Sequence, residues 1–247
     1  MATLLDSVYA LLVAAAFPLL DHFVFLPGFR QRASVDPARA KVWFWKVTLV
    51  ALWVATAIGV ALWIGHARPW TALGFSVPTG WRAWSACALC GLFILQNGLT
   101  LRKVSSSEKA RASVRKQLGS TGALGSLVPT ADSDLAWWIA VSLSAGLCEE
   151  FLFRGYLLWV LSPFVGWWGA AAISVVLFGI AHAYQGPKGI LTTALVGAAL
   201  TATVAIFRSL LPAIALHALI DLGYGLIAWL AFRQPGQPTP AAPPPPA

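Results

Sequence analysis

Residues 135–160, LAWWIAVSLSAGLCEEFLFRGYLLWV, are an apolar run with Glu149, Glu150 and Arg154 in its second half. About 20 mostly apolar residues suffice for a helix that crosses a membrane, so this run predicts such a helix. A charged side chain near the bilayer centre costs about 2.5–3.5 kcal/mol on insertion scales. These three charged residues therefore need partners or a function.

Further apolar runs of similar length lie on both sides of this one. Hydrophobic residues make up 58% of the 247-residue chain and charged residues only 11%, against about a quarter in an ordinary soluble domain. This composition excludes a soluble globular enzyme, a disordered protein and the usual nucleic-acid-binding module. We predict an all-α, polytopic membrane bundle of about seven transmembrane helices. Its spans are expected near residues 5–26, 43–65, 82–101, 135–160, 164–184, 189–207 and 210–232.

The chain divides into three parts by composition. Residues 1–134 combine N-terminal membrane helices with a polar, basic loop at residues 103–133. Residues 135–232 form a helical core that carries most of the polar residues inside the apolar runs. Residues 233–247 are a proline-rich tail, which is expected to be extended, solvated and disordered. No internal repeat is visible, and this disfavours a transporter built from duplicated halves.

The formal net charge of +8 is concentrated in alternate loops, which follow the first, third, fifth and seventh runs. The positive-inside rule therefore predicts the N-terminus outside and the C-terminus in the cytoplasm, in what we expect to be a plasma (inner) membrane. The lipid bilayer is the expected partner of these basic residues, and no nucleic acid is expected. The residues are Arg30, Arg32, Arg39, Lys41, Arg102, Lys103, Lys109, Arg111, Arg115, Lys116, Lys188 and Arg233.

Two local features support this membrane plan. The basic loop is predicted to contain a short surface helix from Ser107 to Leu118. Tryptophans near the ends of the predicted helices, Trp45 and Trp138 among them, are expected at headgroup level, where indole rings are favoured.

The acidic residues fall into three groups. Asp21 and its neighbour His22 lie near the inner end of the first run, where an interfacial position is expected. Glu149, Glu150 and Asp221 lie well inside their runs. The other five are in loops or near chain ends and are expected to be solvated by water: Asp6, Asp36, Glu108, Asp132 and Asp134.

Two pairs of polar residues share helix faces because they are four residues apart. Glu150 and Arg154 can form an ion pair, which would lower the cost of inserting both charges. Asp221 can orient the ring of His217 in the same way. Glu149 points about 100° away from Glu150 around the helix. Because it lacks a partner on its own helix, Glu149 is a candidate general base.

Along their predicted helices, Glu149, His182 and His217 lie at comparable depths in the membrane. With tryptophans and loop residues as interface markers and a rise of about 1.5 Å per residue, they lie about 15, 21 and 12 Å below the outer surface. Helix tilt and side-chain length absorb a spread of this size. The three side chains are therefore expected to share one site in the middle of the membrane.

Three motifs, in this order, resemble those of the CPBP intramembrane proteases, which include CAAX-processing endopeptidases of the Rce1 type and bacteriocin-processing or self-immunity proteins of the Abi group. The family pattern is Glu-Glu-x-x-x-Arg, then Phe-x-x-x-His, then His-x-x-x-Asn or Asp, on successive membrane helices. The corresponding segments here are EEFLFR at 149–154, FGIAH at 178–182 and HALID at 217–221. The resemblance covers about residues 135–230.

The resemblance implies an intramembrane endopeptidase that hydrolyses a peptide bond of a membrane-associated protein or peptide, as in CAAX-type processing. Glu149 and His182 would activate a water molecule, and His217 and Asp221 would stabilise the tetrahedral oxyanion. Glu150 and Arg154 would form a structural pair that positions Glu149, and they would also be able to touch the substrate.

The resemblance leaves the cofactor open. The family is commonly described as metalloproteases, and a metal-free glutamate mechanism is also argued for it. If zinc is bound, the ligands that are acceptable by residue type are Glu149, His182, His217 and Asp221. Asp221 stands where the pattern also allows Asn, and a carboxyl group donates a hydrogen bond only when it is protonated.

Two other functions are compatible with the same residues. A transporter with a buried proton-relay cluster also places Glu, His and Asp inside the membrane. A non-proteolytic immunity or scaffold protein of the same family would keep the fold and the motifs without cleavage. The sequence lacks the His-Glu-x-x-His, Gly-x-Gly-Asp and Gly-x-Ser-Gly motifs of other intramembrane proteases.

Overall fold

The computed structural model describes residues 2–121 and 123–233. Regular structure in this part of the chain is entirely helical, which confirms the predicted all-α bundle. The proline-rich tail predicted at residues 233–247 lies outside the described residues except for Arg233.

The helices follow one another with short connections. Four of the elements are π-helical or 3-10 segments, which carry the labels η1 to η4. The elements are α1 (Leu4–Leu20), η1 (Asp21–Phe25), α2 (Leu26–Ala33), α3 (Pro37–Gly65), η2 (Trp70–Leu73), α4 (Trp81–Ser106), α5 (Glu108–Gly119), α6 (Ala123–Leu127), α7 (Asp132–Glu149), η3 (Glu150–Leu157), α8 (Leu158–Ala181), η4 (Ala183–Gln185), α9 (Gly186–Phe207) and α10 (Leu211–Phe232).

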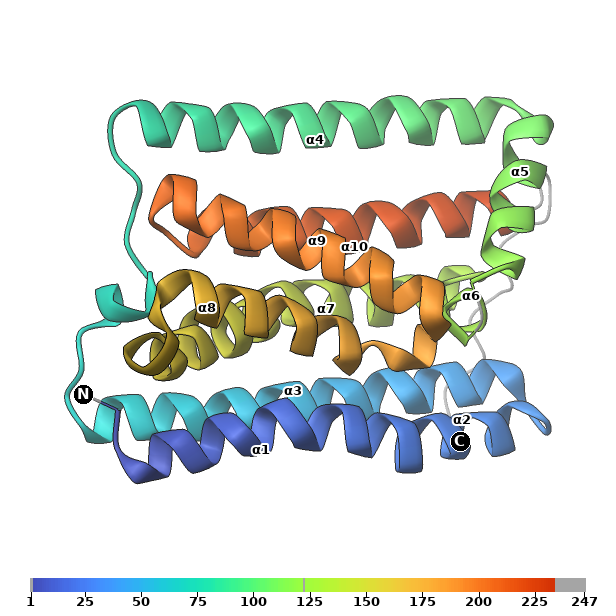
Figure 1. The fold of residues 1–247 in the computed structure, drawn as a ribbon. Helices are drawn as coiled ribbons and strands as arrows, with labels where there is room; N and C mark the ends of the chain where they lie inside the picture. The colour runs from blue at the N-terminus through green and yellow to red at the C-terminus, as the bar shows by residue number, and fades with distance from the viewer. Residues whose placement is uncertain (1, 122, 234–247) are drawn as a thin grey trace, which may run out of the picture.

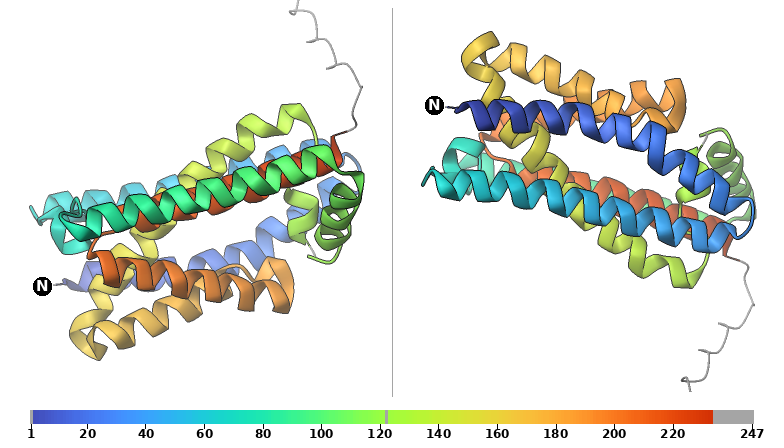
Figure 2. Two further views of the ribbon diagram at one scale, coloured as in Figure 1. Left: turned by 90° about the horizontal axis from the view of Figure 1, so that it is seen from above. Right: turned by 90° about the horizontal axis from the view of Figure 1, so that it is seen from below.

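Six helical stretches in the described chain are long and apolar enough to cross a membrane. The longest, Asp132–Ala181, has 50 residues, but Gly166 interrupts it with φ 70° and ψ 165°. Positive φ favours glycine because it has no Cβ. The chain turns back at this point, as Figures 1 and 2 show. When the parts before and after Gly166 are counted separately, the described chain has seven candidate membrane-spanning segments, the number that the sequence predicts.

Helix α10 occupies the middle of the bundle, in contact with α7, α4 and α9. Helix α8 packs beside α9, and α3 packs beside α7. In Figure 1, α4 forms one edge of the molecule, and α1 and α3 form the opposite edge. The core that carries the motifs, α7 to α10, therefore lies between the N-terminal helices.

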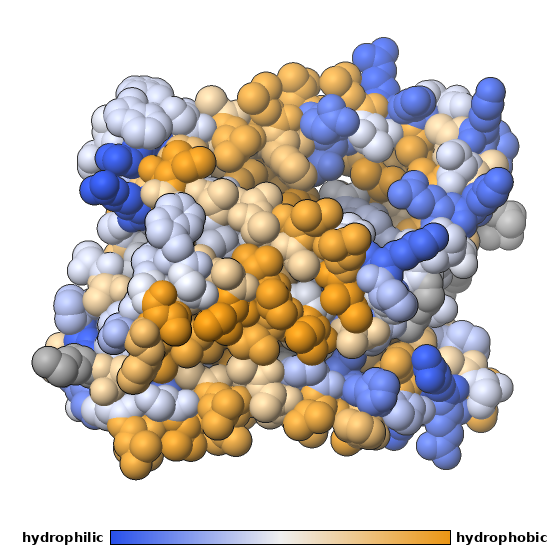
Figure 3. All heavy atoms as spheres, viewed as in Figure 1, coloured by the Kyte–Doolittle hydropathy of each residue, from blue (hydrophilic) through white to orange (hydrophobic). Residues whose placement is uncertain are grey.

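The outer faces of the helices are apolar. Large aliphatic side chains such as Leu11, Val54, Leu95 and Leu191 are more than half exposed. Figure 3 shows apolar residues across the middle of one face, with hydrophilic groups toward both ends. A surface of this kind is stable against lipid tails, so the chain is an integral membrane protein.

Two carboxylates that were expected to be solvated are buried in ion pairs. Asp6 is fully buried and accepts hydrogen bonds of 2.8 and 2.7 Å from Arg68, and a further one from the hydroxyl of Tyr156. Asp134 lies 2.6 Å from the ammonium of Lys41. The expectation was wrong because each carboxylate finds a cation far away in the sequence, which offsets the cost of leaving water.

Trp45 and Trp138, which were predicted to anchor the chain among lipid headgroups, are buried inside the protein. They are 2% and 8% exposed and pack edge to face, with ring centroids 6.3 Å apart. The indole of Trp138 donates a 2.9 Å hydrogen bond to the backbone carbonyl of Asp221. These two rings therefore join α3, α7 and α10 next to the motif residues.

The short surface helix predicted in the basic loop is present as α5. The side chain of Ser107 caps it by accepting a hydrogen bond from the Ala110 amide. Glu108 pairs with Arg111 at 2.7 Å and also with Arg115. Arg115 in turn donates to the carbonyl of Ala231 at 2.5 Å, which attaches α5 to the end of α10.

Candidate functional site

Four of the six predicted site residues, from three membrane-spanning segments, line one cavity of about 240 Å³. Glu149 comes from the end of α7, His182 from the residue after α8, and His217 and Asp221 from α10. The structure thus brings together these residues from all three motifs. Glu150 and Arg154, the other two predicted site residues, lie behind the cavity and do not line it.

The backbone changes from α-helix to π-helix between the two glutamates. Helix α7 ends at Glu149, and η3 begins at Glu150 and continues to Leu157. All eight residues of η3 are buried. Short π-helical segments are rare and occur frequently at functional sites, so the first motif lies at a local break in regular helix geometry.

Glu149 faces two imidazoles. Its Oε2 lies 3.8 Å from Nε2 of His182 and 3.9 Å from Nε2 of His217. This oxygen is buried and has no hydrogen-bond partner among the described residues. Because a buried carboxylate oxygen without a partner is costly, and these gaps exceed a direct hydrogen bond, the geometry favours a water molecule or a polar substrate atom between these groups.

A backbone carbonyl holds the ring of His182. Its Nδ1 lies 2.8 Å from the carbonyl oxygen of Phe178, one helical turn earlier. Since a carbonyl only accepts, Nδ1 carries the proton in this bond, and Nε2 of the neutral ring has a free lone pair. That lone pair lies on the side of the ring nearest Glu149.

His217 is held by Glu150. Its Nδ1 lies 2.8 Å from Oε1 of that carboxylate, and its Nε2 lies 3.7 Å from Oδ2 of Asp221. Nδ1 donates to Glu150 when the latter is ionised, which leaves Nε2 as an acceptor in the neutral ring and a donor in the charged ring. The structure therefore places Glu150 against His217, whereas the sequence predicted that it would position Glu149.

Arg154 completes the support behind the cavity. Its Nη1 lies 3.0 Å from Oε1 of Glu150, and both side chains are fully buried. Its guanidinium stacks over the ring of Phe178 at 4.0 Å, and its Nε donates to Oγ1 of Thr201 at 3.4 Å. A Cβ on Gly197 would lie 2.7 Å from Nη2, so the absence of a side chain there makes room for the arginine.

The four candidate zinc ligands are not arranged as a metal site. No group of three or more His, Cys, Asp or Glu within residues 2–121 and 123–233 is positioned to hold a metal ion. The separations of 3.7–3.9 Å are between Oε2 of Glu149 or Oδ2 of Asp221 and a histidine Nε2. No zinc site is therefore assigned among the described residues.

Asp21 is a polar residue near this site that the sequence pattern did not connect with the motifs. Asp21, which was expected to be interfacial, lines a second cavity of about 80 Å³ together with Glu149 and His182. Its position as one of only four acidic residues inside apolar runs was a signal for this. Because Asp21 is far from the three motifs in the sequence, its contact with their cavity could not be predicted.

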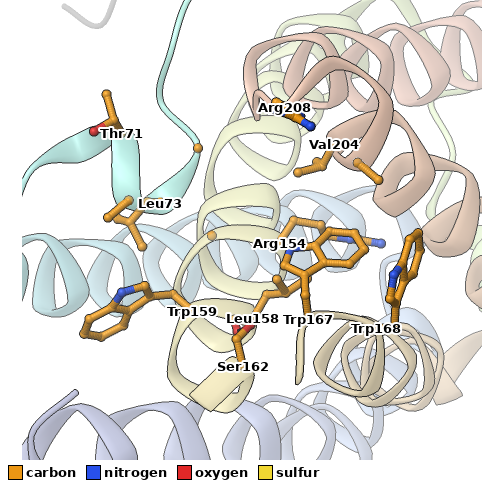
Figure 4. A pocket seen from close by; sticks show the side chains of 14 residues that line it. Thr71, Leu73, Arg154, Leu158, Trp159, Ser162, Trp167, Trp168, Val204 and Arg208 are labelled. Atoms are coloured by element: carbon orange, nitrogen blue, oxygen red, sulfur yellow. The ribbon is translucent and has the colours of Figure 1, made fainter. Parts of the chain in front are cut away.

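A larger cavity, of about 580 Å³, lies elsewhere. It is open at the end of the bundle opposite α5 and is lined by Trp159, Trp167, Trp168 and Arg208, as Figure 4 shows. Of the predicted site residues only Arg154 reaches its wall. Cavity volume alone therefore does not mark a functional site. The cavity at Glu149 is the candidate because polar side chains are concentrated around it.

Residues 131–223 match the family Rce1-like, described as Type II CAAX prenyl endopeptidase Rce1-like. The matched segment runs from the start of α7 into α10 and contains all six predicted site residues. It confirms the resemblance drawn from the three motifs, and at the level of the family it supports endopeptidase activity. No curated protein and no solved structure matches the chain.

Proposed function

We propose that this chain, with its Rce1-like segment at residues 131–223, is an intramembrane endopeptidase that cleaves a membrane-associated protein or peptide. One observation carries the proposal. The unpartnered Oε2 of Glu149 faces Nε2 of His182 and Nε2 of His217 across gaps of 3.8 and 3.9 Å inside a membrane-embedded cavity. This arrangement is suited to holding a reactive water.

Glu149 acts as the general base in this mechanism. A water molecule between Oε2 and Nε2 of His182 directs one hydrogen to each acceptor, which orients its oxygen lone pair toward the substrate. The oxygen attacks the carbonyl carbon of the peptide bond as Glu149 takes the proton. Glu149 then gives this proton to the leaving nitrogen when the C–N bond breaks. One water is consumed, and the protein returns to its initial state.

His217 and Asp221 face the oxyanion that forms in the attack. Nε2 of His217 donates to it when the ring carries both protons, and Asp221 donates when its carboxyl group is protonated. Glu150 and Arg154 do not touch the substrate in this mechanism. They are positioning residues, since Glu150 holds Nδ1 of His217 and Arg154 holds Glu150.

The position of the cavity supports access from the cytoplasm. Leu124 and Leu127 of α6 and Gln185 of η4 line it, and these elements lie at the same end of the bundle as the basic helix α5 (Figure 1). With the basic loops inside, the N-terminus is outside and the C-terminus is cytoplasmic. We assign the protein to a plasma (inner) membrane, with residues 135–232 as the catalytic core and the preceding helices as its scaffold.

A comparison of membrane peptides tests the proposal. Cells that produce wild type or Glu149→Gln are compared for peptides that appear only with wild type, and we expect at least a 100-fold loss of these products in the variant. Glu108→Gln is the matched control, because it removes an exposed carboxylate on α5. The same assay with EDTA distinguishes a zinc-dependent from a metal-free reaction. Equal cleavage by wild type and Glu149→Gln would overturn the proposal.

A further inference from the structure

Two cavities meet at Glu149. The larger one, described above, holds the four motif residues, and a smaller one of about 80 Å³ lies toward η1 and α3. Glu149, His182, Thr48 and Tyr184 line both. Asp21 lines only the smaller one. The general base of the proposed reaction is thus accessible from two sides, of which one has an additional carboxylate.

One oxygen of the Asp21 carboxylate lacks a hydrogen-bond partner within residues 2–121 and 123–233. This oxygen, Oδ2, is buried. The charged or titratable side chains that share its cavity are Glu149, His182 and Tyr184, and none of them forms an ion pair or hydrogen bond with it there. A buried carboxylate oxygen is costly without a partner, so this oxygen requires one that the described part of the chain does not supply.

Water fits this requirement. A single water occupies about 30 Å³ in the liquid and needs two to four polar partners. The cavity of about 80 Å³ accommodates a few, with the hydroxyls of Thr48 and Tyr184 and the carboxylates of Asp21 and Glu149 along its wall. Its volume is too small for a peptide, which has room only in the larger cavity of about 240 Å³.

The backbone at Asp21 has the same irregularity as the backbone at the first motif. Helix α1 changes to the π-helical segment η1 at Asp21, as α7 changes to η3 at Glu150. These are the π-helical segments within the part of the chain that the structure describes. Because such segments frequently occur at functional sites, the break at Asp21 is a second, independent reason to connect it with the site.

We propose that Asp21 positions the hydrolytic water, which reaches Glu149 through the small cavity while the peptide occupies the large one. This inference rests on the proposed endopeptidase function. A peptide bound in the large cavity closes that side to solvent, so each turnover needs its water from another direction. Asp21 accepts a hydrogen bond from the incoming water and is itself unchanged. The water then gives its proton to Glu149 and its oxygen to the carbonyl carbon.

Three variants test the role of Asp21 on the full-length protein, with the peptide found in the Glu149→Gln comparison as substrate. Asp21→Leu removes the acceptor and fills the cavity, and we expect kcat to fall at least 10-fold with KM unchanged within twofold. Asp21→Asn keeps an acceptor oxygen of similar size and should restore kcat to within threefold of wild type. Ala51→Leu narrows the same cavity from α3 and should lower kcat as Asp21→Leu does.

The larger cavity, which holds the motif residues, provides the matched control. Val141 lines only the large cavity, so Val141→Phe should raise KM. If wild type cleaves and Glu149→Gln does not, while Asp21→Leu and Ala51→Leu keep the wild-type kcat, the inference is wrong and the proposed function stands. If Asp21→Leu does not accumulate, Ala51→Leu decides between the two results. Absence of cleavage by wild type would overturn both proposals.

Discussion

Nδ1 of His217 lies 2.8 Å from Oε1 of Glu150, so the second glutamate of the first motif holds an imidazole and does not line the cavity. Arg154 lies 3.0 Å from the same oxygen. The two adjacent glutamates therefore have different surroundings, because they lie on opposite sides of the α7–η3 junction. Glu149 is exposed to the cavity, and Glu150 is part of the protein interior.

The different environments of Glu149 and Glu150 predict opposite effects on stability. Glu150→Gln leaves Arg154 buried without a counter-charge, and removal of one partner from a buried pair costs about 3–5 kcal/mol. Glu149→Gln removes a carboxylate whose Oε2 has no protein partner and should unfold at or above the wild-type temperature. Thermal unfolding in detergent measures both variants. A Glu150→Gln protein as stable as Glu149→Gln would show that the buried pair is not structural.

The close approach of Arg154 to Gly197 predicts a cost for any side chain at that glycine. In Gly197→Ala, the added Cβ would lie 2.7 Å from Nη2 of Arg154 and 2.9 Å from the ring of Phe178. Overpacking of this kind costs about 1–3 kcal/mol. Gly91→Ala on α4 is the control, because nothing lies within 4 Å of its added Cβ, and it should stabilise by about 0.5–1 kcal/mol. Equal unfolding temperatures for the two variants would contradict this packing.

The sequence predicted those parts of the fold that depend on local pattern. The apolar runs, the surface helix α5 and the convergence of Glu149 with two histidines all follow from length, spacing and depth. The partners of Asp6 and Asp134 could not be predicted in this way, since Arg68 and Lys41 lie 62 and 93 residues away. The same limit applies to the contact between Glu150 and His217, 67 residues apart. Contacts between residues far apart in the sequence, and π-helical segments, do not change the hydrophobic periodicity in a recognisable way.

The ion pairs of Glu108 predict a pH-dependent attachment of α5. Hydrogen bonds from Arg111 and then Arg115 hold the pKa of the Glu108 carboxyl below its ordinary value. A carboxyl group with a lowered pKa contributes stability above its unfolded pKa, about 4.3, and loses it as the pH falls through the lower folded pKa. We therefore expect hydrogen exchange in residues 108–119 to be protected at neutral pH and to increase as the pH falls below about 4.

Comparison with Glu108→Gln at each pH separates this effect from the intrinsic pH dependence of exchange. The variant lacks the titrating group, so its protection relative to an unstructured peptide should not change as the pH falls from neutral to below 4. At neutral pH the variant should exchange faster than wild type. Identical profiles for the two proteins would show that these ion pairs do not hold α5.

The proposed oxyanion role of Asp221 requires a hydrogen-bond donor at that position. Asp221→Asn replaces a group that donates only when protonated with an amide that donates at any pH, and we expect kcat/KM within about 10-fold of wild type. Asp221→Leu removes the donor, and loss of one oxyanion donor lowers kcat by about 10²–10³-fold. The hydrogen bond from Trp138 is to the backbone carbonyl of residue 221, so both variants should keep α7 and α10 together and accumulate normally. An Asn variant as inactive as the Leu variant would mean that the charge of Asp221 beside His217, at 3.7 Å, is what the reaction needs.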